Sequence, residues 1–273
     1  MKNVLLLLLA ITFLIAGCTP KKPTEKTVLS WGTPYFGTPE ALNGKVKELK
    51  HITYWAIEKD GKVEKGAVIS LKQRSDSGWS QDFTAYFNEG GLLTRCDYLG
   101  DNSVIQSSIS TEIENGKIVK EKWSISDTLR SIANFKFDQK GHIVEVSRMS
   151  VMPDTLMFKY LITNNEKGNP ILGKILITTK EVFNGKSELK WDENGRVIET
   201  VYYNSKDSLT SRMVMTYNKQ GFLETQKFYN KTGKLTLDMV GTSTFDEKGN
   251  WLTTIWKKSG KPYAIEERTC VYY

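Results

Sequence analysis

Residues 217–223 read Tyr217-Asn218-Lys219-Gln220-Gly221-Phe222-Leu223, and this pattern decides the fold because it recurs along the chain. Its form is an aromatic residue, Asp or Asn, two polar residues, Gly, any residue, and an apolar residue. Other copies begin at Phe87, Phe137, Trp191, Tyr229 and Phe245, and a weaker copy begins at Ile57. Asp or Asn caps a type I turn, and Gly takes the left-handed position that closes it. Each copy therefore predicts a β-hairpin with a three-residue loop and a G1 bulge.

In such a hairpin the first residue of each copy faces the last one across the two strands. The predicted pairs are Ile57–Val63, Phe87–Leu93, Phe137–Ile143, Trp191–Val197, Tyr217–Leu223, Tyr229–Leu235 and Phe245–Trp251. All are apolar on both sides, and such pairs contribute about 0.2–1 kcal/mol each. They predict one apolar face of a sheet. We expect the opposite face to be solvated, because Asp or Asn begins it and because polar residues mostly follow the turn glycine, namely Lys62, His142, Arg196, Lys234 and Asn250, with Phe222 as the exception.

The turn glycines also recur at a regular spacing. Gly61, Gly91, Gly116, Gly141, Gly168, Gly195, Gly221 and Gly249 lie 25–30 residues apart. A unit of about 27 residues holds two strands and two turns, and no long helical period appears after the N-terminus. The prediction is an all-β fold, a long antiparallel meander of hairpin repeats (about 27 residues each) with roughly 14–17 strands from about residue 45 to 273. A one-turn helix begun by Thr38 and Pro39 precedes its first turn at Asn43-Gly44.

A meander with one apolar face must cover that face, so we expect the sheet to be curled or closed into a barrel-like form. A barrel of this many strands is too wide to be filled by its own side chains. A cavity, a plug or a flattened cross-section is therefore predicted. The solvated face carries Lys, Arg and Glu where lipid would require an apolar band, so the sequence does not favour a membrane-embedded porin.

Residues 1–17 have the layout of a secretory signal peptide. Lys2 supplies a positive charge, and the 13 residues 4–16 are uncharged, which is too short for a spanning helix of about 20. The sequence Ile15-Ala16-Gly17-Cys18 resembles the lipobox of bacterial lipoproteins. The resemblance implies that cleavage precedes Cys18 and that this cysteine carries the lipid, including palmitate. An ordinary signal peptide with an incidental cysteine is the alternative.

Three segments are predicted: a lipoprotein signal peptide (1–17), a lipidated Cys18 with a flexible tether (18–37), and a single β-repeat domain (38–273). Residues 19–26 (TPKKPTEK) contain two prolines and no apolar side chain, so we expect an extended or disordered linker. Its lysines either lie against anionic headgroups or are simply solvated. The anchor predicts a cell-envelope location at the outer membrane facing the periplasm, with display at the cell surface as the alternative.

Composition excludes some classes of function. Loss of residues 1–17 removes Lys2 and lowers the net charge from +7 to +6, a mild excess spread along the chain, so nucleic acid is not an expected partner. Cys96 and Cys270 remain in a compartment where disulfides persist, and they either pair or stay as two buried thiols.

Catalytic chemistry finds little support in the residue pattern. His142 is expected on the wet face, no Cys/His spacing suits zinc, and no nucleophile elbow or phosphate loop occurs. We therefore expect no catalytic residues, no metal and no cofactor. Aromatic residues are the better indication of binding, with Trp55, Trp79, Trp123 and Trp256 as candidates for stacking on a glycan or peptide. Core packing is the alternative for each of them.

The repeat resembles the tyrosine-aspartate (YD) repeats of RHS-type proteins, best in the copies that begin at Tyr217 and Phe245. No copy has the literal Tyr-Asp, and the layout is similar to small Bacteroidetes repeat lipoproteins of unknown function. From the anchor, the lack of catalytic motifs and the aromatic residues, we expect a non-catalytic envelope lipoprotein, a binding or scaffold module with a glycan or protein partner and a membrane contact through its lipid. The alternative is an envelope hydrolase acting on glycan or peptide with carboxylates in a concave site.

Overall fold

The computed structural model describes residues 26–29, 40–77, 81–177 and 182–273. The signal peptide, Cys18, the one-turn helix expected at Thr38 and the candidate Trp79 lie outside these residues. The strands are β1 (Lys26–Leu29), β2 (Glu40–Asn43), β3 (Val46–Lys59), β4 (Lys62–Val68), β5 (Asp82–Phe87), β6 (Leu93–Leu99), β7 (Ile105–Glu114), β8 (Lys117–Ile125), β9 (Thr128–Phe137), β10 (Ile143–Val151), β11 (Asp154–Asn164), β12 (Pro170–Ile177), β13 (Val182–Trp191), β14 (Val197–Asn204), β15 (Leu209–Tyr217), β16 (Leu223–Asn230), β17 (Leu235–Phe245), β18 (Trp251–Lys258) and β19 (Lys261–Tyr272). The helical elements are α1 (Leu71–Ser77) and a 3₁₀ turn, η1 (Asp101–Ser103).

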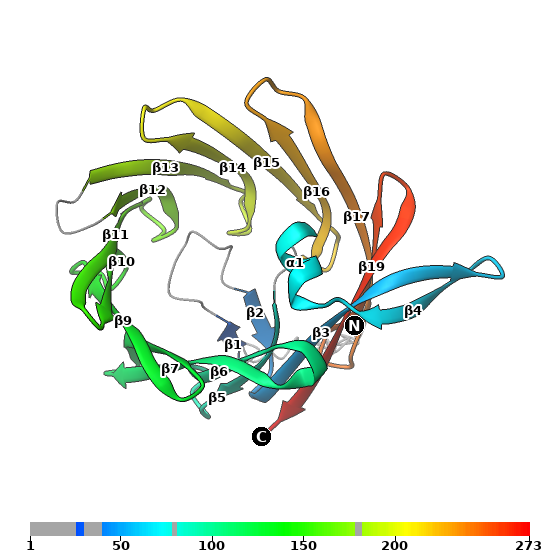
Figure 1. Cartoon of the computed structure of the whole chain (residues 1–273), viewed down its shortest axis with the longest axis horizontal. Helices are drawn as coiled ribbons and strands as arrows, with labels where there is room; N and C mark the ends of the chain where they lie inside the picture. The colour runs from blue at the N-terminus through cyan, green and yellow to red at the C-terminus, as the bar shows by residue number, and fades with distance from the viewer. Residues whose placement is uncertain (1–25, 30–39, 78–80, 178–181) are drawn as a thin grey trace, which may run out of the picture.

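The predicted all-β meander is confirmed, and it closes into a barrel (Figure 1). Strands β5 to β19 pair with their chain neighbours in antiparallel order, and β3 joins β19 to β5, which gives a ring of 16 strands. Strand β4 pairs with the outer part of β3 and extends away from the ring. Closure removes the vulnerable edges that an open meander would leave.

Six of the seven predicted cross-strand pairs are confirmed, from Phe87–Leu93 to Phe245–Trp251. The seventh, Ile57–Val63, is wrong, because Val63 pairs with Glu58. Asp60 and Gly61 both have positive φ angles (52° and 72°) and form a two-residue turn, which changes the register of the weaker copy.

The turn chemistry is also as expected. In the copy at residues 191–197, Asp192 Oδ1 accepts the N–H groups of Asn194 at 3.0 Å and Arg196 at 2.9 Å. The turn after β14 has the same form, with Asn204 Oδ1 accepting the N–H groups of Lys206 and Ser208, although it contains no glycine. There Asp207 takes the glycine position with φ 59°, which Asp tolerates better than most residues.

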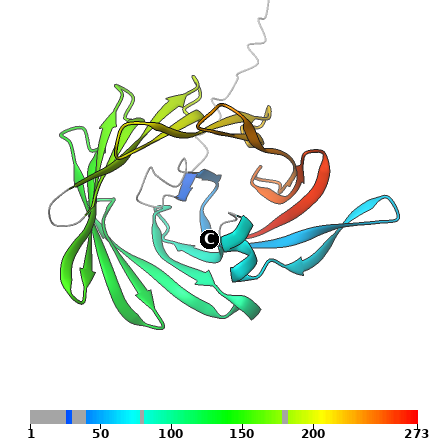
Figure 2. The same cartoon turned by 45° about the horizontal axis from the view of Figure 1, so that its top comes forward.

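The apolar face lines the inside of the ring. Leu42, from the β1–β2 hairpin that lies within the ring, packs in one cluster with Leu49, Ala85 and Cys96 (Figures 1 and 2). A second cluster on β9, β10 and β11 includes Val146, and Ile118 packs against both clusters. The β1–β2 hairpin therefore forms part of the predicted plug.

The outer face carries ion pairs that bridge adjacent strands. Lys120 and Glu112 lie 2.6 Å apart, Lys136 and Glu145 lie 2.9 Å apart, and Lys190–Glu199 is a further pair of this kind. Lys186 and Glu188 pair within β13, and Lys65 on β4 reaches Glu267 on β19 across β3. Register places these residues one position away from the lumen-facing rows, so they point outward. The wall of the barrel is thus charged, as the sequence predicted.

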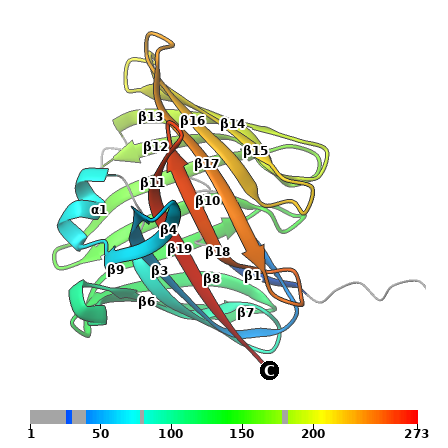
Figure 3. The same ribbon diagram turned by 90° about the vertical axis from the view of Figure 1, so that its right-hand side faces the viewer.

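The N-terminal hairpin is held at one end of the barrel, and α1 lies at the other (Figure 3). Asn250, expected to be solvated, is only 1% exposed, because its side chain holds the backbone of Asn43. Asn250 Oδ1 accepts the Asn43 N–H at 2.7 Å, and Nδ2 donates to the Asn43 carbonyl at 2.9 Å and to Tyr272 Oη at 2.7 Å. In addition, β1 comprises residues 26–29, which belong to the expected tether, and backbone pairing with β2 orders them.

No disulfide joins Cys96 and Cys270. Register places Leu49 and Ala85 between them across the sheet, so three strand spacings of about 4.8 Å separate them. A disulfide requires Cα atoms within about 7 Å, so the two thiols stay apart.

Candidate functional site

The α1 end of the lumen holds two of the tryptophans that the sequence suggests for binding. Trp55 and Trp256, two of the binding candidates, both pair with Ala264, one from each side. Trp256 is 6% exposed and lies over Gly241, where a β-carbon would come within 2.8 Å of its ring. Trp55 is only half-buried and meets Tyr263 edge to face at 5.5 Å. Both tryptophans are binding candidates from the sequence, and the register places them on either side of Ala264.

Trp123 belongs to another sector. It pairs with Ile109 on β7 and Ser131 on β9, on the lumen face. Nearby, the buried Glu121 carboxylate lies 3.5 Å from Arg148 Nη2, and Arg148 Nη1 donates to Ser131 Oγ at 3.0 Å. Burial raises the pKa of Glu121, and Arg148 opposes that rise. The tryptophans are therefore not a single continuous surface.

Beside the first group, β3 changes its neighbour. It pairs with β5 up to His51 and with β4 from Tyr54 onward, which leaves the Thr53 N–H without a strand partner on that side, while the Thr53 carbonyl accepts the Ile69 N–H at 3.0 Å. Asp82 Oδ1 accepts the Thr53 N–H at 2.7 Å, while Arg74 Nη2 donates to the Thr53 carbonyl at 3.2 Å. Arg74 and Asp82 also form an ion pair of 2.6 Å. These two buried charges close the gap in the sheet.

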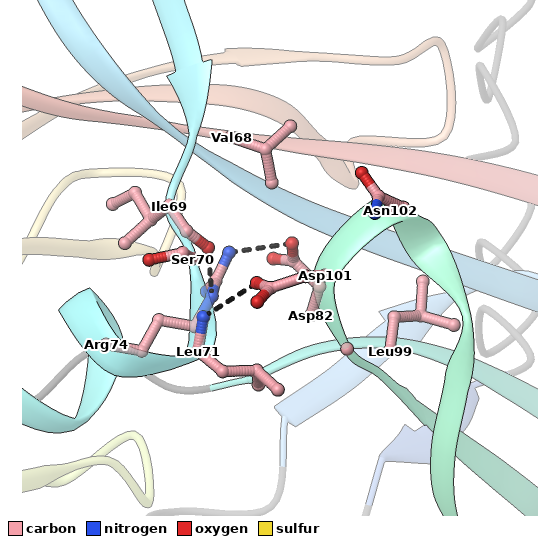
Figure 4. A pocket seen from close by; sticks show the side chains of 10 residues that line it. Val68, Ile69, Ser70, Leu71, Arg74, Asp82, Leu99, Asp101 and Asn102 are labelled. Carbon is pink, nitrogen blue, oxygen red and sulfur yellow. Dashed lines mark hydrogen bonds and ion pairs between the residues drawn. The ribbon is translucent and has the colours of Figure 1, made fainter.

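A cavity of about 340 Å³ adjoins this junction, between α1 and the β6–β7 connection (Figure 4). Its apolar lining comes from Val68, Ile69, Leu71 and Leu99, and its polar lining from Ser70, Arg74, Asp82, Asp101 and Asn102. The volume suits a small ligand. The sequence did not predict the cavity, because α1 has only seven residues and no helical periodicity to reveal it.

The two carboxylates in the cavity bear on the hydrolase alternative. Asp82 uses one oxygen for the Thr53 N–H and the other for Arg74, and Asp101 Oδ1 accepts the Leu71 N–H at 3.0 Å. Burial raises the pKa of Asp82, which Arg74 counteracts. Both carboxylates hold local structure, which favours a structural role over acid–base catalysis.

A second buried polar group lies on the lumen side of β3. His51 is 3% exposed, and its Nε2 lies 3.6 Å from Glu266 Oε1. Trp256 Nε1 donates to Glu266 Oε2 at 2.7 Å, and His51 meets the ring of Phe83 at 5.1 Å. Glu266 thus holds a charge inside the barrel wall.

Acid is expected to weaken the fold through Glu266. Burial opposes its ionisation, but the facing His51, the Trp256 N–H and Arg268 together hold its pKa below the ordinary 4.5. A carboxyl with a lowered folded pKa contributes stability above its unfolded pKa, and this contribution is lost as the pH falls through the folded pKa. The melting temperature should therefore drop as the pH is lowered from about 5 to about 3.

The variant Glu266→Gln keeps an acceptor for Trp256 but cannot ionise. It should melt at a lower temperature than the natural chain at neutral pH, and the difference should shrink in acid. Differential scanning calorimetry across this range measures both effects. A constant difference at every pH would contradict the role of the Glu266 charge.

Among the described residues, no group of three His, Cys, Asp or Glu side chains could hold a metal ion. Within the same part of the chain, no helix has the length and hydropathy of a membrane crossing.

Neither a protein-family model nor a curated protein matches this sequence. Among solved structures, a porin-like protein from Bacteroides uniformis matches with a TM-score of 0.51 and 8% identity, over 83% of this chain and 96% of that chain. A porin-like protein from Bacteroides vulgatus matches over 92% of this chain and 98% of that chain, with 11% identity and a TM-score of 0.33. The TcdB2-TccC3 toxin matches over 79% of this chain and 15% of that chain, with 8% identity and a TM-score of 0.33. The likeness to the Bacteroides uniformis protein shows a shared bacterial β-rich fold.

Proposed function

We propose that this chain is a non-catalytic binding module of the bacterial cell envelope, held at the membrane by a lipid on Cys18. One observation carries the proposal: the outward face of the closed barrel carries ion pairs such as Lys120–Glu112 and Lys136–Glu145. Charged side chains on a lipid-facing wall would cost roughly 2–4 kcal/mol for each Lys or Arg at the bilayer midplane. A barrel with this charged outer face is more stable in water than in lipid, so it needs a separate anchor to stay at the membrane.

The position of the N-terminal hairpin gives the module an orientation. Strand β1 begins at Lys26, eight residues after Cys18, and eight extended residues span at most about 29 Å. The end of the barrel that holds β1 and β2 would then face the membrane. The opposite end, with α1 and the cavity, would face away from it and meet the partner.

The resemblance to YD repeats belongs to the same proposal. The confirmed hairpins explain the aromatic and Asp/Asn positions as turn chemistry and cross-strand pairing. We therefore infer that the chain consists of degenerate repeats whose hairpins form the wall of the barrel. The outer membrane facing the periplasm is the proposed location.

Replacement of Cys18 by Ser should abolish incorporation of labelled palmitate and move the protein from the membrane fraction to the soluble fraction. Two or more acyl chains anchor stably, whereas an unlipidated chain with a charged barrel has no comparable attachment. The measurement is metabolic labelling followed by fractionation, with Cys96→Ser as the matched control that should keep its label. A Cys18→Ser protein that stays in the membrane after alkaline washing would contradict the anchor.

A further inference from the structure

The lysines at two neighbouring hairpin tips differ from those on the barrel wall. The turns at 230–234 and 257–261 carry Lys231, Lys234, Lys257, Lys258 and Lys261, all exposed, and neither turn contains an acidic residue. We call these turns the lysine tips. Among the described residues, none of the five lysines forms an ion pair, whereas wall lysines such as Lys136 and Lys190 do.

The two tips are adjacent in the ring and lie at the α1 end. Lys258 pairs with Met239 on β17, and the Ser259 N–H donates to the Asp238 carbonyl at 3.0 Å. Lys234 precedes Met239 by five residues, so the first tip extends about 16 Å beyond the second at about 3.3 Å per residue. A ligand that touches both tips must therefore be an extended molecule.

Aromatic rings border the second tip. Lys258 Nζ lies 4.9 Å from the centre of the Tyr263 ring, and Tyr263 meets Trp55 at 5.5 Å. Both aromatic residues are only partly buried. Flat apolar surfaces beside unpaired ammonium groups suit a ligand that has both apolar ring faces and anionic substituents.

We propose that the lysine tips, with Trp55 and Tyr263, bind an acidic glycan. Carboxylates along the glycan would lie against the lysines, and the sugar faces would lie against the aromatic rings. This inference rests on the proposed envelope location, which makes a glycan a more accessible polymer than a nucleic acid. The tips lie away from the end that holds the N-terminal hairpin, so the glycan would bind on the side opposite to the anchoring membrane.

The experiment uses the full lipidated chain in detergent, with oligogalacturonate and oligomannuronate as carboxylated glycans and dextran as the neutral one. Calorimetric titration should show binding to a carboxylated glycan and none to dextran, with affinity falling about tenfold on moving from low to high salt. The triple variant Lys257→Gln, Lys258→Gln, Lys261→Gln should bind about tenfold more weakly. The matched control, Lys140→Gln, Lys167→Gln, Lys219→Gln, removes the same charge from exposed turns at the opposite end and should bind normally.

The aromatic part is tested separately by Trp55→Phe, which keeps a ring and should lower affinity a few-fold without a change in melting temperature. Three results would overturn the proposal: neither carboxylated glycan binding at millimolar concentration, equal losses in the two triple variants, or equal affinity for polyglutamate or single-stranded DNA. The palmitate experiment tests only the lipid anchor. If the chain carried no lipid but still bound the glycan, the proposed anchored function would be contradicted and the proposed glycan surface would not.

Discussion

Replacement of Arg74 by Met is expected to lower the free energy of unfolding by about 3–5 kcal/mol, the loss typical of removing one partner from a buried ion pair. Arg74 and Asp82 are 4% and 6% exposed, so the remaining Asp82 carboxylate would be left buried without its cation. The same change removes donors from the Thr53 and Ile69 carbonyls at the point where β3 exchanges β5 for β4.

Urea unfolding measures this loss, and its pH dependence identifies the cause. Burial already raises the pKa of Asp82, and loss of Arg74 should raise that pKa further. A carboxyl with a raised folded pKa binds its proton more tightly in the folded state, so its contribution to stability declines as the pH rises above the unfolded value. The deficit of Arg74→Met should therefore be larger at neutral pH than near pH 4.

The control is Lys65→Gln, which removes a solvent-exposed ion pair between Lys65 on β4 and Glu267 on β19, the strands on either side of β3. Exposed pairs contribute little, so its unfolding curve should coincide with that of the natural chain. If Arg74→Met and Lys65→Gln unfolded alike, the strand exchange would not depend on the buried pair.

The second large effect is expected for Asn250→Ala, with a loss of about 2–4 kcal/mol. The change removes three hydrogen bonds of a side chain that is only 1% exposed and leaves the N–H and carbonyl of Asn43 without their Asn250 partner. Because Asn43 ends β2, we also expect the β1–β2 hairpin to detach more readily from the lumen.

Trypsin digestion under native conditions reports on that detachment, since cleavage after Lys45 requires the hairpin to open. Asn250→Ala should be cut faster, and its urea midpoint should fall. Lys234 occupies the same position in the turn after β16 but is exposed, so Lys234→Ala should show neither effect. Unchanged cleavage in Asn250→Ala would show that other contacts hold the hairpin.

Much of the wall could be predicted because its determinants are local. Asp or Asn and Gly at fixed positions select the turn, and the turn sets the register of its two strands, as the Tyr217–Leu223 and Phe245–Trp251 pairs show. The prediction failed at Ile57, where Asp60-Gly61 selects a shorter turn, and at Asn250, whose partner lies 207 residues away.

The sequence by itself determined the all-β meander, its turns, its charged outer face and the residues at its N-terminus that predict a lipid anchor. All of these depend on residues within a few positions of one another, where backbone conformation and side-chain alternation act. Only the tertiary structure decided that the ring closes between β19 and β3, that Arg74 and Asp82 seal the strand exchange, and that Trp55, Tyr263 and the lysine tips lie together. These contacts join distant residues through register and closure, and one sequence contains no local signal for them.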